Sequence, residues 1–439
     1  MGGPAVIGEA GDDVDRPAAL NPVVFVEQLG RPLRLLVLCY ELPPIGGGTG
    51  VACSQVLALL ARRDDIELEV ISSCAGSEPM TVRDGRARLH LLPVGKRDLR
   101  FWQPDELLRW TIGAVRQARV LAAERPFDLC HCWSGLPSGV VGWWLRDLQP
   151  YLVSLSGSDV PGYNRRLRLL DPLLMRHLAR QVWRGATSVF AVSANLRAMA
   201  QVSAPEVSIG LLANGVDAQF FRPQENLGNA TFVFAGRLIE RKGVDTLLEA
   251  VRLVAARQPQ LHLVIAGDGP EREALQAMRR TFGVEDQVTF AGQLARDELA
   301  ELLGHSGVIV LPAVTDAMPN VVLEGMAAGM AVIVTETSSA NIVDGNGQLV
   351  PPRDSQALAR AMQRYLEDPA LLARHQRRSR LLALGRSWEA VAEDHVQRFR
   401  RALASSRARP AAGRSSRGLT RNQVHEAAGA NHRQGQARR

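Results

Sequence analysis

The sequence has few cysteines, no long apolar run, and no segment with the features of a signal peptide. Five cysteines in 439 residues are too few and too irregularly spaced for a disulfide framework, so a reducing cytosol is the expected compartment. No uncharged apolar run reaches the ~18 residues that a membrane-spanning helix needs, because even the richest stretch, 321–334, carries Glu324. The acidic N-terminus lacks the basic flank and apolar core of a signal peptide.

Several motifs that would supply a metal or a nucleophile are also missing. The run Cys130-His131-Cys132 has no second pair at zinc-ligand spacing. The sequence Asp13-Val14-Asp15 is the only D-x-D, and it falls in a segment without periodicity, which gives no reason to invoke a divalent cation. Neither G-x-S-x-G nor H-E-x-x-H occurs. We therefore expect a site without a metal ion.

The net charge of +7 and the pI near 9.6 arise from one end of the chain. Residues 405–439 contain eight arginines and one acid, which leaves 44 basic and 44 acidic residues in the rest of the sequence. The Gly, Ala, Arg and Gln content of this segment predicts a disordered basic tail. The main body is neutral in sum, and we expect no nucleic-acid partner.

Alternating strand and helix patterns predict an α/β protein made of two Rossmann-like domains with parallel sheets. The continuous apolar run 33–40 is typical of a strand buried on both faces, and similar short runs alternate with helix-period stretches along the chain. Tandem domains of this kind face each other across a central cleft, where small ligands usually bind. The expected divisions are a flexible extension 1–32, an N-terminal domain 33–222, a C-terminal domain 223–386 beginning with a polar linker at 224–229, and a helix 387–404.

A glycine-rich loop, 46–50, separates the first strand from the first helix. Glycines there let backbone N–H groups approach an anion, and the following helix adds partial positive charge. The loop also fits a dinucleotide-binding turn, with Glu67 or Glu69 as the acid that would bind the ribose. A nicotinamide-dependent oxidoreductase and a merely flexible connection both stay open at this point.

Two stretches of the second half carry groups suited to a diphosphate and a sugar. Arg237 and Lys242 fall in one strand-to-helix connection, where a guanidinium fork and a point charge suit a diphosphate. The stretch 316–329 places Asp316 just before a helix and Glu324 in its second turn. The helix N-terminus can hold phosphate, and the flanking carboxylates can accept hydrogen bonds from sugar hydroxyls. This set favours a nucleotide sugar.

The stretch D-A-M-P-N-V-V-L-E-G-M-A-A-G, which begins at Asp316, resembles the E-x7-E signature of the retaining glycosyltransferases with the GT-B fold, of the family 4-like, group 1 type. The resemblance covers roughly residues 34–404. It continues, in the family's order, at 191–193, 214–217, 234–243, 266–270, 292 and 347–352.

The resemblance implies a donor that is a nucleoside-diphosphate sugar, with no other cofactor, and an acceptor that is a glycan or a lipid-linked sugar of cell-surface polysaccharide or glycolipid synthesis. Arg237 and Lys242 would bind the diphosphate, Glu324 the ribose, and Asp316 the transferred sugar. Helix 387–404 would cross back onto the first domain. The loop glycines Gly47 and Gly48 would approach the diphosphate, and the backbone of the following residues would line the sugar and phosphate: Met318, Pro319, Asn320, Val321 and Val322.

The sequence departs from the family pattern at two positions. The first acid of the signature is usually Glu, and Asp316 is one methylene shorter; a displacement of about 1 Å can cost ~100-fold in rate. Many relatives carry His directly before the glycine at the position of Ser156, and this His is thought to support the transfer. We expect Ser156 and Asp159 to be the polar groups there, with His131 either at the same edge or in the core.

A non-catalytic nucleotide-sugar-binding protein is the alternative that these departures favour. The stretch 171–184 adds a membrane question, since it predicts a helix with apolar residues on one face and Arg176, Arg180 and Arg184 on the other. Such a helix can lie on an anionic membrane surface, here the inner face of the cytoplasmic membrane, or serve as a core helix with a solvated basic face.

Overall fold

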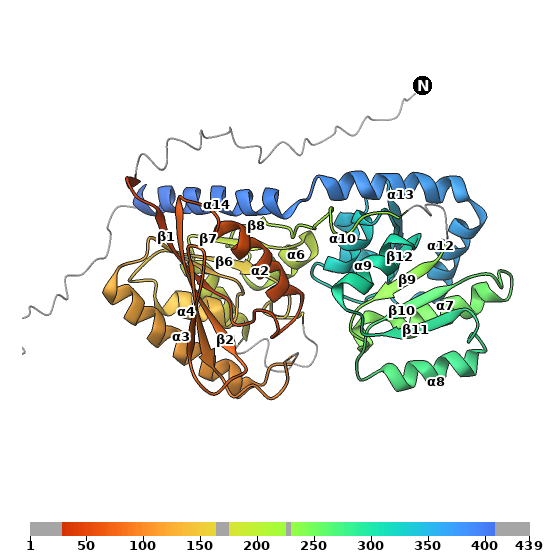
Figure 1. Ribbon diagram of the computed structural model, residues 1–439, viewed down its shortest axis with the longest axis horizontal. Helices are drawn as coiled ribbons and strands as arrows, with labels where there is room; N and C mark the ends of the chain where they lie inside the picture. Colours follow the sequence, from red (N-terminus) through yellow and green to blue (C-terminus); the bar gives the residue numbers. More distant parts are fainter. Residues whose placement is uncertain (1–28, 100, 164–174, 225–229, 409–439) are drawn as a thin grey trace, which may run out of the picture.

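The computed structural model describes residues 29–99, 101–163, 175–224 and 230–408, which form two α/β domains side by side (Figure 1). The N-terminal domain holds an eight-stranded sheet of order β3-β4-β2-β1-β5-β6-β7-β8, in which only the β3–β4 pair is antiparallel. The C-terminal domain holds a six-stranded parallel sheet of order β11-β10-β9-β12-β13-β14. The predicted fold class, GT-B-like with two Rossmann-like domains, is confirmed.

The N-terminal domain alternates strands with helices along the chain. Its strands are β1 (Leu33–Leu38), β2 (Ile66–Cys74), β3 (Met80–Asp84), β4 (Ala87–Pro93), β5 (Leu129–Cys132), β6 (Tyr151–Leu155), β7 (Ser188–Ala191) and β8 (Ile209–Leu211). Its helices are α2 (Gly48–Leu60), α3 (Pro104–Glu124), α4 (Ser138–Trp144), α5 (Arg176–Gly185) and α6 (Ala194–Ser203).

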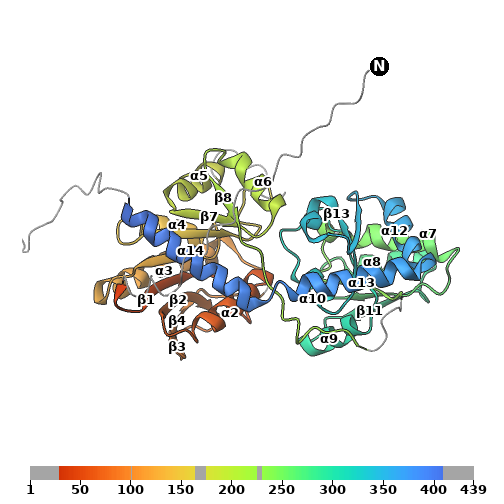
Figure 2. The same ribbon diagram turned by 90° about the horizontal axis from the view of Figure 1, so that it is seen from above.

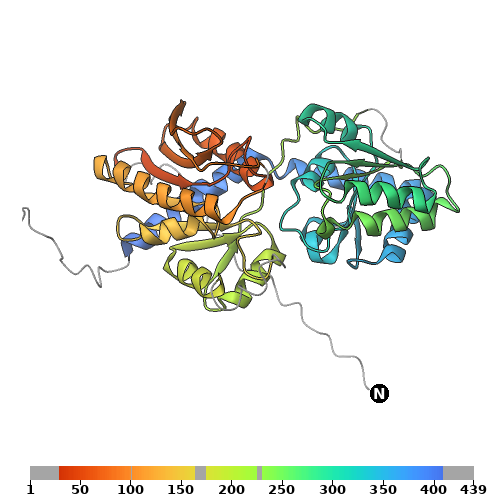
Figure 3. The same ribbon diagram turned by 90° about the horizontal axis from the view of Figure 1, so that it is seen from below.

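Strand β1 is apolar throughout because helices cover both faces of the sheet. Leu36 and Leu38 pack with α3, α4 and α5, whereas Leu35 and Val37 pack with α2 and the last helix, α14 (Trp388–Ala408). Figure 3 shows α3, in orange, in front of the sheet and α14, in blue, behind it. Successive side chains of a strand point to opposite faces, so a strand covered twice has no solvent-facing position.

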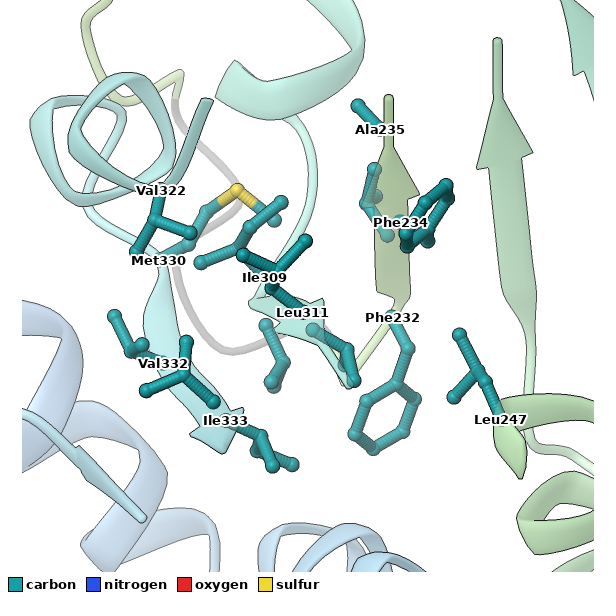
Figure 4. Packing of buried hydrophobic residues seen from close by; sticks show 14 of the residues in the cluster. Phe232, Phe234, Ala235, Leu247, Ile309, Leu311, Val322, Met330, Val332 and Ile333 are labelled. Carbon is teal, nitrogen blue, oxygen red and sulfur yellow. The ribbon is translucent and has the colours of Figure 1, made fainter. Parts of the chain in front are cut away.

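The C-terminal domain has one hydrophobic core that its sheet and helices share. Figure 4 shows Phe232, Phe234, Ile309, Leu311 and Val332 from three neighbouring strands packed in its centre. Its strands are β9 (Phe232–Ala235), β10 (Leu263–Ala266), β11 (Val288–Gly292), β12 (Val308–Leu311), β13 (Ala331–Thr335) and β14 (Gly347–Val350). Its helices are η3 (Glu240–Lys242), α7 (Val244–Ala255), α8 (Arg272–Phe282), α9 (Arg296–Gly304), α10 (Asn320–Ala327), α11 (Glu336–Ser339), η4 (Ala340–Ile342), α12 (Ser355–Glu367) and α13 (Pro369–Leu384).

The chain returns to the first domain through its last helix. Helix α13 lies on the C-terminal domain and α14 runs across the N-terminal domain (Figure 2), where Trp388, Val396 and Phe399 enter the core. Burying each such side chain contributes roughly 1.5–3 kcal/mol. The helix continues to Ala408, so the first four residues expected in the disordered tail are helical. Residues 409–439 lie outside the described part of the chain.

The chain passes between the domains earlier than the sequence predicts. Val216, Ala218 and Phe221 already pack in the C-terminal core, so the passage falls at Gly215 and not in the expected linker, of which residues 225–229 are not described. The backbone N–H of Val216 donates to the carbonyl of Arg386 at 2.9 Å, where the chain crosses back. A Cβ at Gly215 would lie 3.0 Å from the backbone of Ser387, so the two connections touch.

Other boundaries differ at the ends of elements. Helix α2 begins at Gly48, so part of the glycine loop forms its first turn. Strands β3 and β14 were not predicted; β3 is exposed along its whole length, which removes the apolar signal. Residues 29–32 lie against the first domain, with Arg31 bonded twice to Asp128 at 2.7 and 2.8 Å. The remainder of the expected extension, 1–28, is not described.

Candidate active site

A cleft of about 240 Å³ opens where the domains meet. Helix α2, the two connections between the domains, and the N-termini of α9 and α10 form its walls. Its lining residues are Pro43, Val51, Ser54, Gln55, Gly215, Val216, Asp217, Phe221, Arg296, Asn320, Glu324 and Trp388.

A buried ion pair occupies the carboxyl edge of the C-terminal sheet, where the sheet faces the first domain, and neither of its residues lines the cleft. Lys242, at the end of η3, donates a hydrogen bond to the carboxylate of Asp316, and each side chain is 11% exposed. Arg241 approaches the other carboxylate oxygen at 3.9 Å. Burial alone would raise the pKa of Asp316, but Lys242 and Arg241 hold it below its usual value. Two sequence-predicted site residues, Lys242 and Asp316, therefore lie in direct contact.

Arg237 extends from the loop after β9 toward the first domain. Its guanidinium lies 5.8 Å from the ring centre of Phe101, an exposed aromatic side chain of the N-terminal domain. Desolvation and repulsion from Arg241 lower the pKa of Arg237, while Asp316 and Glu41 act in the opposite sense. Arg237, Arg241 and Lys242 thus concentrate positive charge at one place, and Arg241 is a cation that the sequence interpretation did not assign.

The start of α10 joins the two domains. The side-chain amide of Asn320 donates to the carbonyl of Gly48 at 3.2 Å and accepts from Asn214 at 2.8 Å. Pro319 occupies the N-cap position, and the first N–H groups of a helix have no partner within it. Met318 and Val322 are buried in the core of the domain, which fixes this backbone opposite the glycine loop, and Val321 packs partly against the same core.

Glu324 lies on α10 and lines the cleft. Burial raises the pKa of its carboxyl to about 7, and the positive charge of Arg296 partly opposes that rise. Arg296 also lies 3.6 Å from Asp217 and 4.1 Å from the ring centre of Phe220. A carboxyl group that lines a cleft and has a pKa of about 7 can accept hydrogen bonds from a bound hydroxyl when it is ionised.

The glycine loop is shaped by a residue that the sequence analysis missed. A Cβ at Gly46 would lie 2.3 Å from Oε2 of Glu41, and one at Gly50 would lie 2.8 Å from the Glu41 carbonyl. A Cβ at Gly47 would meet open space, which leaves its backbone accessible. Glu41 is buried directly beyond β1, and its place between a strand and a proline pair could have signalled a loop residue at the sheet edge.

The loop after β6 contains the polar residues predicted for the first domain. The carboxylate of Asp159 accepts the backbone N–H groups of Gly135, Ser156 and Gly157 at 2.6, 3.1 and 2.7 Å. Ser156 is half-buried, and a Cβ at Gly157 would lie 3.3 Å from Ala317, next to Asp316. Asp159 therefore shapes a loop that faces the second domain. A direct catalytic part for Asp159 and Ser156 stays a prediction.

His131 belongs to the core. Its ring is buried, with Nε2 2.8 Å from Oγ of Ser154, and it packs against His395 and Phe399 of α14. Cys130 and Cys132 point to the other face of the sheet, into the core beneath α3, α4 and α5, with their sulfur atoms 3.9 Å apart. Within the described ranges, no cluster of three or more His, Cys, Asp or Glu side chains could hold a metal ion.

The acids proposed for a dinucleotide ribose are engaged elsewhere. Glu67 pairs with Arg125 at 2.7 Å, and buried Glu69 pairs with Arg34, Arg88 and His90. Both lie near the start of β2, away from the carboxyl ends of the strands where ligands bind. These contacts argue against the nicotinamide alternative.

Helix α5 covers part of the basic stretch proposed for a membrane surface. Ala179, Val182 and Trp183 face the core, while Arg180 and Arg184 pair with Glu206 at 2.6 and 3.5 Å. Residues 171–174 of the expected helix are not described. Across the described residues, every helix is too short or too polar to span a bilayer.

Two family models match consecutive parts of the chain. The model "Glycosyl transferase 4-like domain" matches residues 47–215, and the model "Glycosyl transferases group 1" matches residues 216–381. Their junction falls where the structure passes between the domains. The chain belongs to the group 1 glycosyl transferases, with a glycosyl transferase 4-like N-terminal domain, as the sequence resemblance predicted.

Two relatives align with this chain over almost their whole length. The glycogen synthase of Mycobacterium tuberculosis (strain CDC 1551 / Oshkosh) is 26% identical over 393 residues, covering 83% of this chain and 94% of the relative. The D-inositol 3-phosphate glycosyltransferase of Rhodococcus erythropolis is 26% identical over 420 residues, covering 85% and 92%.

Solved structures show the same fold. Sucrose-phosphate synthase from Thermosynechococcus elongatus superposes with a TM-score of 0.73 at 22% identity, covering 85% of this chain and 100% of that chain. HepE from Anabaena, in complex with UDP-glucose, gives a TM-score of 0.65 at 19% identity, covering 84% and 99%.

Proposed function

We propose that this chain transfers a sugar from a nucleoside-diphosphate sugar to a glycan or lipid-linked acceptor, with retention of the anomeric configuration. The observation that carries the proposal is the grouping of Arg237, Lys242 and Asp316 where the C-terminal sheet faces the first domain, together with α10, whose Asn320 and Glu324 line the interdomain cleft. The HepE structure that holds UDP-glucose shares this fold, which supports a donor of the same class.

The cations and the helix start account for donor activation. Negative charge develops on the diphosphate as the sugar leaves, and groups already aimed at that charge stabilise it without reorganisation. Arg237, Lys242 and the first N–H groups of α10 supply such groups. The acceptor would attack the face that the leaving group departs from, and a diphosphate oxygen would take the acceptor proton, since the cleft offers no free histidine among the residues assigned to it.

We propose that the transfer needs no metal ion. Three cationic side chains, those of Arg237, Arg241 and Lys242, gather at the proposed diphosphate site and can neutralise the leaving group without a divalent cation. A chelator is therefore expected to leave turnover unchanged.

The relatives differ in the acceptor for which they are named. One relative is named for an extended polysaccharide and another for a small phosphorylated acceptor, so similarity alone does not choose between them. We favour a step of cell-surface polysaccharide or glycolipid synthesis at the cytoplasmic side of the membrane, with peripheral contact through the basic face of α5, although Glu206 neutralises part of that face.

A non-catalytic nucleotide-sugar-binding protein is the second candidate. Asp316 in place of Glu and Ser156 in place of His are the observations that favour it. It predicts that the donor binds but that no nucleoside diphosphate is released.

A panel of nucleotide sugars separates the two candidates. UDP-, ADP- and GDP-linked sugars are incubated with the full chain, with and without a lipid extract, and with and without a chelator. The proposed transferase releases nucleoside diphosphate from one donor, faster with the extract and equally with the chelator, and NMR of the product shows the donor's anomeric configuration. Binding without release supports the second candidate, and no binding contradicts both.

A further inference from the structure

Arg241 joins the two domains beside the Asp316 carboxylate, and the proposed function gives it no role beyond its charge. Its Nη1 donates to the hydroxyl of Tyr163 in the first domain at 3.0 Å and to the backbone carbonyl of Thr315 at 3.2 Å. A guanidinium Nη1 carries two hydrogens, so both are used and residues of both domains hold the group in place. The ring of Tyr163 also lies 5.5 Å from the guanidinium carbon.

Tyr163 is a packed residue of the first domain. It is 8% exposed and belongs to the N-terminal core, and Ala317 from the loop after β12 packs in the same core. Its backbone N–H donates to the carbonyl of Val160 at 3.2 Å. A Cβ at Gly157 would lie 3.3 Å from Ala317 and 3.4 Å from the ring of Tyr163, so these residues meet at one point. The hydroxyl that Arg241 contacts therefore has a fixed position.

The two carboxylate oxygens of Asp316 face different cations. Oδ2 accepts a hydrogen bond from the ammonium of Lys242. Oδ1 accepts the backbone N–H of Ala317 at 3.0 Å and lies 3.9 Å from Nη1 of Arg241. One cation can therefore leave the carboxylate while the other remains beside it.

The two cations differ in how firmly they are held. Among the described residues, the ammonium of Lys242 bonds to Asp316 alone, on a flexible four-carbon stem that can turn to another anion. Arg241 is held at its guanidinium by Tyr163, and its backbone carbonyl accepts the N–H of Val314 from the loop after β12 at 2.9 Å. Lys242 is thus the cation that can move to a phosphate, whereas Arg241 stays beside the carboxylate.

We propose that Arg241, held from the first domain by Tyr163, is a positioning residue for the Asp316 carboxylate. Once Lys242 turns to the diphosphate, Arg241 keeps that carboxylate in place and ionised. This inference rests on the proposed function. An ionised Asp316 can accept hydrogen bonds from the transferred sugar, whereas burial without a neighbouring cation would favour its protonated form. Because Tyr163 belongs to the other domain, the carboxylate is in position only while the two domains are in contact.

Tyr163→Phe tests this role without changing any charge. The substitution removes the hydroxyl and keeps the ring, so Arg241 loses one charge-assisted hydrogen bond and the carboxylate loses its fixed position. Such a loss, with a displacement of up to about 1 Å, is expected to lower kcat about 10- to 100-fold. The donor KM should stay near its wild-type value, because Arg237 and Lys242 are unchanged.

Steady-state release of nucleoside diphosphate by the full chain measures both constants. UDP-glucose, ADP-glucose and GDP-mannose are the donors, and a lipid extract supplies the acceptor. Tyr151→Phe is the matched control, since its hydroxyl makes a buried hydrogen bond to the carbonyl of Val182 within the first domain at 2.5 Å. Both variants are expected to lose stability in thermal unfolding, but only Tyr163→Phe is expected to lose kcat. Arg241→Lys keeps the charge without the guanidinium, and it serves with the same expected fall in kcat if Tyr163→Phe does not fold.

A double-mutant cycle shows whether Tyr163 acts through Arg241. Arg241→Gln removes the guanidinium, so adding Tyr163→Phe to it should lower kcat no further. Independent losses in the cycle, an unchanged kcat in Tyr163→Phe, or a raised KM with unchanged kcat would each overturn this inference alone. If the wild type releases no nucleoside diphosphate from any of the three donors, the proposed function is overturned and this inference with it.

Discussion

Lys242 and Asp316 form a buried ion pair at the carboxyl edge of the C-terminal sheet, so two groups suited to the same proposed donor neutralise each other. Under the proposed function, a diphosphate that draws the ammonium of Lys242 away would leave the Asp316 carboxylate free to accept hydrogen bonds from the transferred sugar. Phosphate binding and sugar binding would then be linked at one pair of side chains.

Removing the ammonium group of Lys242 is expected to cut donor turnover. Loss of one preorganised charge-stabilising group typically costs about 10²–10³ in rate, so Lys242→Ala should lower kcat/KM by at least that factor. Steady-state release of nucleoside diphosphate measures it. Arg252→Ala removes an exposed cation of the same domain and should leave turnover unchanged; equal rates in wild type and Lys242→Ala would contradict the assignment.

Neutralising Asp316 is expected to destabilise the empty protein more than the liganded one. Breaking a buried ion pair from one side costs about 3 kcal/mol, because Lys242 is left buried without a counter-charge. A bound nucleoside diphosphate restores that counter-charge. Asp316→Asn should therefore melt at a lower temperature than wild type and gain more from ligand, as thermal unfolding with and without the ligand shows. If the ligand raised the melting temperature of wild type and Asp316→Asn equally, the result would contradict the proposal that the ligand's charge replaces that of Asp316 beside Lys242.

Replacing Glu324 with Gln should raise the stability of the protein above pH 7 but weaken donor binding. Its carboxyl ionises at about 7 in the folded protein and near 4.5 in the unfolded chain, so its burial costs stability that develops as the pH rises between these values. Glu324→Gln should thus be more stable than wild type above pH 7, with the difference gone below pH 4.5. Denaturant titrations at several pH values measure it.

The same substitution should weaken the donor. Losing a charged acceptor for ribose hydroxyls is expected to raise the donor KM about 10- to 100-fold, with a smaller change in kcat. A variant with unchanged KM would show that Glu324 does not contact the donor.

Much of the site could be predicted because its residues follow strands directly. Arg237, Lys242 and Asp316 come after β9 and β12, neighbouring strands of one sheet, so topology brings them together at its carboxyl edge. Glu324 was predictable from its spacing on α10. The fold class followed from strands such as β1, whose apolar run reflects helices on both faces.

Other features depend on contacts distant in sequence. Asn320 lies 272 residues after Gly48, whose carbonyl accepts its side-chain amide, and no local pattern connects them. The same holds for Arg241, whose Nη1 donates to the hydroxyl of Tyr163 in the other domain at 3.0 Å. His131 was ambiguous because a strand residue can face a cleft or a covering helix, and only the path of α14 decides.

The buried rings of His131 on β5 and His395 on α14, which pack against each other, should make the docking of α14 sensitive to acid. Burial lowers the pKa of His395 to about 4 and that of His131 well below its ordinary value, so both are neutral in the fold. The unfolded chain binds protons below pH 6.5, and stability is therefore lost as the pH falls from about 6.5 toward 4. His395→Leu should flatten this loss in denaturant titrations, and an unchanged pH dependence would contradict it.

A crystal structure of the chain with the nucleoside diphosphate that it binds tests the central claim most directly. The account predicts diphosphate oxygens within hydrogen-bond distance of the Arg237 guanidinium, the Lys242 ammonium and the first backbone N–H groups of α10, with Lys242 moved off Asp316. A diphosphate bound away from these three groups, or a Lys242 still paired with Asp316 beside an occupied site, would contradict it.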